Sequence, residues 1–169
     1  MRFTPVLLGA AALAFASAAS AQVSLAPISF SPEFQESLDD ELGAREGDVL
    51  RAAVTDAVQA ALARRGVSVG GGGLVVEISI IDADPNRPTM QQLIDEPSLD
   101  ATGSVSIGGA ELRAVLRDNG AVVGEVTHRR YNHSLADLSG PASTWTEARR
   151  AIRQFAEKVA DAYVAARGA

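Results

Sequence analysis

The chain has 169 residues, a net charge of −6 and no cysteine, and 47% of its residues are apolar. This length fits one domain, and the composition is typical of a folded globular protein and not of a disordered one. The acidic balance disfavours nucleic-acid binding, because a duplex requires a concentrated positive surface. Without cysteine the chain offers no disulfide, thiolate metal site, cysteine nucleophile or lipidated amino-terminal cysteine.

Residues 1–21 have the pattern of a secretory signal peptide. Arg2 supplies a positive charge, an apolar run extends over residues 5–15, and Ala19-Ser20-Ala21 fits the small-residue rule of a cleavage site. A retained membrane anchor is the alternative, but a span needs about 20 apolar residues and this run is shorter. We therefore predict cleavage after Ala21 and a soluble periplasmic product with no stable membrane span.

Residues 22–169 are predicted to form a single α/β domain. The segment 23–30 alternates apolar and polar residues as a strand does, and Pro27 within it indicates an edge position or a bulge. Residues 31–47 are acidic and interrupted by glycine, which favours a loop with one helical turn near residues 34–42.

The next segment has the spacing of an amphipathic helix. Apolar residues recur at helical intervals over residues 49–65, Asp48 is suited to cap the first turn, and Gly66 is suited to end the last one. The glycine run 70–73 lacks the Lys-Ser/Thr and the following helix of a phosphate-binding loop, so it predicts a plain connection. Residues 74–82 then form the clearest strand, with one wholly apolar face.

Residues 83–103 form an unusually long connection for a domain of this size. They contain three prolines, and Thr89 is suited to cap a short helix. The segment is predicted to be either a functional flap or a mobile excursion.

Residues 104–132 have the pattern of a β-hairpin that turns at Asp118-Asn119-Gly120. A three-residue turn would place Leu116 opposite Val122 on a wholly apolar face, and Arg113 opposite Glu125 on the other face. We therefore predict that turn, with Gly120 in a left-handed conformation as a bulge, and a second bulge at Gly108-Gly109.

The last helix is predicted to start with a capping box at residues 144–147 and to run to about Arg167. The order of elements is thus β-α-β-β-β-α. The fold class is α+β (mixed α/β), with two helices on one face of a roughly four-stranded mixed sheet and the first two strands parallel.

The sequence leaves two kinds of functional site as alternatives. One is a small metal-dependent or hydrolytic enzyme using Asp82, Asp84 and His128. The two aspartates leave their strand on one side and could be neighbours, and imidazole ligands normally need two or three convergent partners. The other is an interaction surface with no cofactor. It would combine apolar residues on the second sheet face with a basic, aromatic strand end: Val75, Ile81, Val115, Val123, His128, Arg129, Arg130 and Tyr131.

Residues 108–125, GGAELRAVLRDNGAVVGE, are similar to the hairpin of small bacterial periplasmic and lipoprotein domains of unknown function. More distantly, the order of elements resembles the lipopolysaccharide-assembly lipoprotein LptE and the amino-terminal domain of TolB. The resemblance implies a periplasmic domain with no catalytic motif to carry over. Lipid-anchored relatives begin with cysteine after the signal peptide, where this chain has Gln22.

The favoured hypothesis is a non-enzymatic, envelope-associated binding or assembly module that acts through an exposed sheet face or edge. Its partner would be an envelope protein or an anionic envelope component, and not nucleic acid. A homodimer formed by pairing of sheet edges is a further possibility.

Overall fold

In a computed structural model, residues 21–137 and 143–168 are described, and the predicted leader up to residue 20 lies outside them. The described residues form six strands, four α-helices and two short helices of other types. The strands are β1 (Ala21–Leu25), β2 (Ser29–Phe30), β3 (Val67–Val69), β4 (Leu74–Asp84), β5 (Gly109–Asp118) and β6 (Ala121–Tyr131). The helices are α1 (Pro32–Ser37), the π-helix η1 (Leu38–Leu42), α2 (Ala44–Ala63), α3 (Met90–Asp95), the 3₁₀-helix η2 (Leu135–Asp137) and α4 (Thr146–Gly168).

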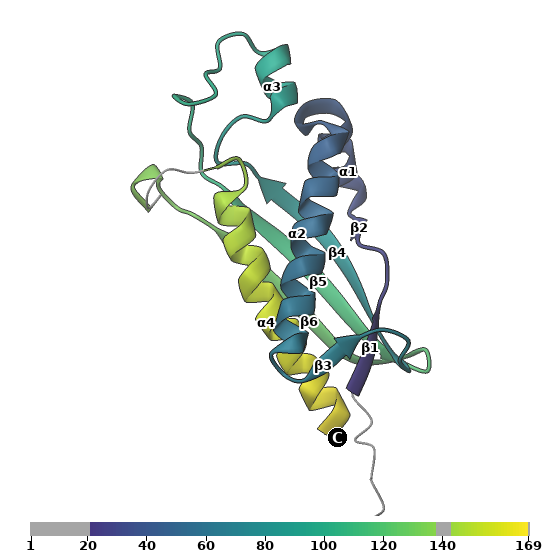
Figure 1. Ribbon diagram of the computed structural model, residues 1–169. Helices are drawn as coiled ribbons and strands as arrows, with labels where there is room; N and C mark the ends of the chain where they lie inside the picture. Colours follow the sequence, from purple (N-terminus) through teal and green to yellow (C-terminus); the bar gives the residue numbers. More distant parts are fainter. Residues whose placement is uncertain (1–20, 138–142, 169) are drawn as a thin grey trace, which may run out of the picture.

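The sheet is mixed and its strand order is β3-β1-β4-β5-β6, with β2 also pairing with β4. β1 and β2 are parallel to β4, whereas β5 and β6 add antiparallel strands. The helices α2 and α4 lie side by side over one face (Figure 1). This confirms the predicted fold class, but the strand number differs, because the first predicted strand is divided around Pro27 and β3 adds a strand beside β1.

The core lies between this helix pair and one face of the sheet. The predicted apolar face of β4 is buried there, and α4 contributes a long stripe that includes Phe155 and Val159. Hydrophobic burial of this face holds the helix layer on the sheet. The core residues of β4 and β5 are Leu74, Val76, Ile78, Ile80, Ala83, Ala110, Leu112, Ala114 and Leu116.

The segment 31–47, predicted as a loop with one helical turn near residues 34–42, is helical over most of its length. Phe34, Leu38 and Leu42 are buried and recur every four residues, which is the spacing of an apolar helix face. The acidic residues between them made this spacing hard to recognise in the sequence. The predicted cap at Asp48 is wrong, since α2 starts after Gly43, whose φ of 93° suits glycine. Asp48 lies inside α2 and pairs with Arg51.

The β5–β6 hairpin has a two-residue turn, and the predicted three-residue turn is wrong. Asn119 and Gly120 have φ angles of 48° and 86°, as a type I′ turn requires. A register shift next to the turn then places Leu116 opposite Gly124. That register differs by two residues from the predicted one, so the same side chains still face the core.

The predicted start of the hairpin at residue 104 and its bulge at Gly108-Gly109 are also wrong. β5 begins only at Gly109, and the irregularity lies in β4, between Ile80 and Asp82.

Residues 85–108 leave the sheet and carry α3 beyond the end of the helix layer (Figure 1). The predicted cap at Thr89 is confirmed, because its hydroxyl accepts from Gln92 N–H in a full capping box. The buried Asn86 fixes the base of this segment: its N–H donates to Thr144 (2.7 Å) and its side-chain oxygen accepts from the N–H of Glu147 (2.8 Å). The excursion is therefore tied to the start of α4.

The start of α4 does not form the predicted capping box. Glu147 is 1% exposed, and its carboxylate pairs with Arg130 of β6 and with Arg150. Trp145 is buried beside it and donates to Glu46 of α2 (2.6 Å). These contacts join α4 to both α2 and the sheet.

Candidate functional site

The basic and aromatic segment at the end of β6 is divided between the two faces of the sheet. His128 and Arg130 face the helix layer, where Arg130 pairs with Glu147. Arg129 and Tyr131 face the other side, with the guanidinium carbon of Arg129 4.6 Å from the ring centre of Tyr131. Strand side chains alternate, so this division is unavoidable. The four residues do not form one continuous basic patch.

His128 is held against α4. One ring nitrogen lies 3.2 Å from the side-chain oxygen of Gln154, and the other lies 3.1 Å from the ammonium of Lys158. Partial burial lowers the pKa of His128, and the positive charges of Lys158 and Arg130 lower that pKa further. The neutral imidazole is therefore favoured, as an acceptor from Lys158.

Asp82 and Asp84 lie on the opposite face of the sheet from His128. Tyr131 donates its hydroxyl to Asp82 at 2.5 Å, and its ring lies over Gly109, where a Cβ atom would clash with it. Burial, and then the charge of Asp82, raises the pKa of Asp84, while burial and the bond to Asp82 raise the pKa of Tyr131. This cluster has a structural role in tying β4 to β6 across β5.

The three residues suggested for a metal or hydrolytic site therefore do not converge. Asp82 is opposite Glu111 in the sheet register and His128 is opposite the next residue, Leu112, so the two side chains are on different faces. Across residues 21–137 and 143–168, no three His, Asp or Glu side chains are grouped so as to hold a metal ion.

None of the helices formed by the described residues lies over the second face of the sheet (Figure 1), and charged pairs cross that face. Arg117 pairs with Glu77 at 2.9 Å, Arg129 pairs with Glu111 at 3.1 Å, and Arg113 pairs with Glu125. Among the predicted contact residues, Val75 and Val115 are half-buried within this array, Ile81 is half-buried at the bulge of β4, and Val123 is 43% exposed. The face is thus mainly polar, with apolar patches.

The two edges of the sheet differ strongly. The edge formed by β3 has only three residues. The other edge is the 11-residue strand β6, which pairs with β5 on one side and with no strand on the other among the described residues. Long edge strands expose a row of backbone donors and acceptors that can pair with another strand.

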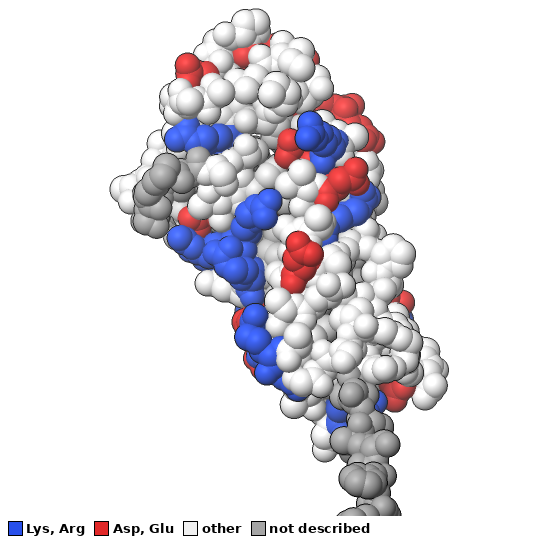
Figure 2. All heavy atoms as spheres, in the orientation of Figure 1, with Lys and Arg blue, Asp and Glu red and all other residues white. Residues whose placement is uncertain are grey.

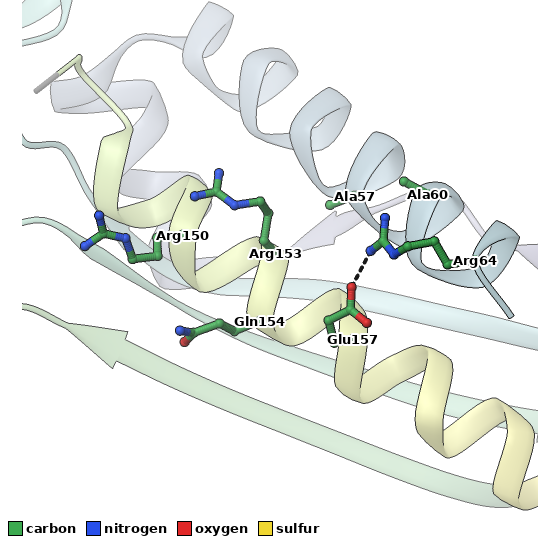
Figure 3. Close-up of a pocket in the computed structure, with 7 residues that line it drawn as sticks. All are labelled: Ala57, Ala60, Arg64, Arg150, Arg153, Gln154 and Glu157. Carbon is green, nitrogen blue, oxygen red and sulfur yellow. Dashed lines mark hydrogen bonds and ion pairs between the residues drawn. The ribbon is translucent and has the colours of Figure 1, made fainter.

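The outer surface of the helix layer has a basic stripe that the sequence analysis missed. Lys and Arg side chains gather along α4 in Figure 2. A groove of about 360 Å³ lies here between α2 and α4, shown in Figure 3. It is lined by Ala57, Ala60, Arg64, Arg150, Arg153, Gln154 and Glu157.

A signal for this groove was present in the sequence. Arg150, Arg153 and Glu157 are spaced by three and four residues, which places them on one side of a helix. The pairing of α2 with α4, which brings Arg64 to them, depends on the tertiary fold.

The excursion around α3 carries a second exposed group, which is apolar. Met90 and Ile94 are 69% and 66% exposed on α3, and Val105 and Ile107 are also exposed. A hollow of about 320 Å³ lies at the base of this segment, between Pro85 and Ile107. The segment 83–103, predicted to be a functional flap or a mobile excursion, projects from the sheet with α3 and exposes several apolar side chains.

The chain matches the family described as "Protein of unknown function (DUF3313)" over residues 9–159. No curated protein matches it. Within the part of the chain that the structure describes, no helix is both long enough and apolar enough to cross a membrane.

Three solved structures are similar to the fold. The hypothetical protein CT253 from Chlamydia trachomatis is 11% identical with a TM-score of 0.52, and the match covers 87% of this chain and 99% of that one. XCC0632 from Xanthomonas campestris, of family DUF330, is 14% identical with a TM-score of 0.50 over 87% and 86% of the two chains. A PelC dodecamer from Paraburkholderia phytofirmans is 15% identical with a TM-score of 0.44 over 83% and 86%. The first two likenesses support the fold alone.

Proposed function

Because the chain belongs to DUF3313, a family of proteins of unknown function, its role has to come from its geometry, and we propose a non-enzymatic assembly module of the bacterial envelope. The signal-like residues 1–21 support a periplasmic location. The separation of Asp82 and Asp84 from His128 across the sheet supports a role without catalysis. The observation that carries the assembly role is the long edge of the sheet at β6.

The edge strand β6 has the features of a strand that accepts another strand. It contains no proline, and four of its residues are β-branched: Val122, Val123, Val126 and Thr127. α4 covers it from one face only and leaves its outer side open. Addition of an antiparallel strand would pair the backbone groups on that outer side.

A second copy of this chain fits the edge in one register. If two β6 strands pair antiparallel about Thr127, Glu125 of each copy is opposite Arg129 of the other, and Val123 is opposite Tyr131. Opposite charges, aromatic and β-branched residues, and threonine pairs are the cross-strand combinations that stabilise antiparallel sheets, at about 0.2–1 kcal/mol each.

Neighbouring registers are less favourable. Pairing about Val126 would place Arg129 opposite Val123, whereas pairing about Glu125 would place like carboxylates opposite each other. In the register about Thr127, the pairs Arg113–Glu125 and Glu111–Arg129 within each copy become a row of alternating charges that crosses the interface. We therefore commit to this register.

The test uses charge reversal and mixing. Glu125→Arg alone or Arg129→Glu alone places like charges opposite each other twice in the dimer, so each variant should dimerise at least about tenfold more weakly. An equimolar mixture of the two variants restores two opposite-charge pairs and should form a heterodimer. Sedimentation equilibrium of the purified chains measures both, and melting temperatures control for loss of folding.

A wild-type chain that stays monomeric at all concentrations, or a mixture that behaves like its components, would contradict self-pairing. A photo-crosslinker at Thr127 in intact cells distinguishes the two partners that could pair with the β6 edge, a second copy of this chain and another envelope protein. Crosslinks between copies support self-assembly, and crosslinks to an extended segment of another envelope protein support heterologous strand addition.

A further inference from the structure

The groove between α2 and α4 is a second surface feature, and it does not depend on the pairing of β6. Two small side chains of α2, Ala57 and Ala60, leave room between the helices. In Figure 3, Arg153 extends from α4 into this space and Arg64 reaches across from α2 to Glu157. Its volume of about 360 Å³ is within the usual range for sites of small ligands, about 300–1,000 Å³.

The groove is positive although the chain as a whole is acidic. Its lining includes three guanidinium groups and one carboxylate, whereas the net charge of the chain is −6. The carboxylate is that of Glu157, which is already bound by Arg64 and by Arg65. These two guanidinium groups hold the pKa of Glu157 below its usual value, so it is ionised and its charge is compensated.

Arg153 is the cation that this arrangement leaves available. Among the described residues it has no hydrogen-bond or ion-pair partner, although it lines both the groove and the adjoining hollow beside Asp56. Arg150, in contrast, contacts the buried Glu147 (2.9 Å), which Arg130 also binds. Two guanidinium groups share the single carboxylate of Glu147, whereas Arg64 and Arg65 face the two carboxylates of Glu157 and Asp161.

We propose that this groove binds a phosphate-bearing group, with Arg153 and Arg64 as its main ligands and Arg150 at its far end. The planar fork of arginine donates two parallel hydrogen bonds to phosphate or carboxylate oxygens. A phosphate monoester offers three acceptor oxygens, which can be contacted from two helices at once, whereas a carboxylate offers two oxygens in one plane. Guanidinium groups on both walls therefore favour the phosphate.

The ligand group is a phosphate monoester. Two kinds of envelope molecule carry it: a small phosphorylated solute and the headgroup of a lipid. The probes are inorganic phosphate, titrated by calorimetry, and vesicles of phosphatidylcholine with and without phosphatidic acid, measured by flotation. Both use the full chain.

Phosphate binding is compared among three variants and the wild type. Arg153→Ala and Arg64→Ala should each weaken phosphate binding about tenfold, as expected for loss of one charged hydrogen-bonding group. Arg45→Ala, an exposed arginine near the start of the same helix α2, should leave binding unchanged. Arg153 has no partner to lose, so the melting temperature of its variant should match the wild type.

Binding to phosphate and to phosphatidic acid vesicles supports the site with a lipid source, and binding to phosphate alone supports it with a soluble ligand. Absence of binding to both probes overturns the proposal. Equal weakening by Arg45→Ala also overturns it, since the attraction would then be a general effect of surface charge.

Discussion

Two carboxylates of α4, Glu147 at its start and Glu157 midway along it, fix the helix to the rest of the protein by ion pairs in opposite environments. At its start, Glu147 is 1% exposed and pairs with Arg130 of β6 and with Arg150. Midway along the helix, Glu157 pairs with two arginines at the end of α2, Arg64 and Arg65, and its side chain is 45% exposed.

This difference shows that geometry alone does not determine how much an ion pair contributes to the stability of the fold. A buried carboxylate has lost its hydration, so removing one partner leaves an uncompensated group. An exposed carboxylate keeps its water, and its pair typically contributes about 0–1 kcal/mol. The start of α4 should therefore respond to substitution far more than its middle.

The largest expected effect is at the buried pair. Glu147→Ala should lower the free energy of unfolding by about 3 kcal/mol, toward the lower end of the range for broken buried pairs, because Arg130 and Arg150 can still reach water. Glu157→Ala on the same helix is the matched control and should cost less than about 1 kcal/mol. Urea unfolding measures both, and equal losses would contradict the comparison.

The next effect concerns Asn86, which joins the base of the α3 excursion to the start of α4. Asn86→Ala removes the acceptor of the buried N–H of Glu147, at 2.8 Å, and should cost about 1–3 kcal/mol. Because Asn86 also donates to Ser106, limited proteolysis within residues 87–105 should become faster. Unchanged cleavage would show that the excursion is held by its other contacts.

Much of this fold could be predicted from periodicity. The apolar face of β4 and the stripe of α4 follow from spacing that repeats over many residues. The parallel start of the sheet follows from the rule for crossover connections between strands. The start of α2 could not be placed, because Asp48 has the chemistry of a cap while the buried Leu38 and Leu42 extend the helical stripe upstream.

The surface sites were harder to predict, since they depend on which elements become neighbours. Arg129 and Arg130 are adjacent in sequence yet face opposite sides of the sheet. Arg64 and Arg153 are far apart in sequence yet line the same groove. One-residue shifts such as those near Leu116 and Ile80 depend on local backbone packing, which residue patterns do not encode.

A smaller effect is expected at the exposed end of α4. Asp161 accepts from Arg65 at 2.6 Å, and Asp161→Asn should cost about 0.2–1 kcal/mol at low salt. The loss should largely vanish at about 1 M salt, where the Debye length falls to about 3 Å. A salt-independent loss, measured by urea unfolding at both ionic strengths, would indicate a buried interaction instead.

The smallest effect is a change in pH dependence midway along α4, where His128 contacts Gln154 and Lys158. Its pKa is lowered from 6.5 in the folded state, so the unfolded chain binds more protons as the pH falls through that value. The free energy of unfolding should therefore decrease on acidification from pH about 7 toward 5, and His128→Gln should flatten this slope. The measurement is urea unfolding across that pH range. An unchanged slope would show that the pH dependence comes from groups other than the imidazole of His128.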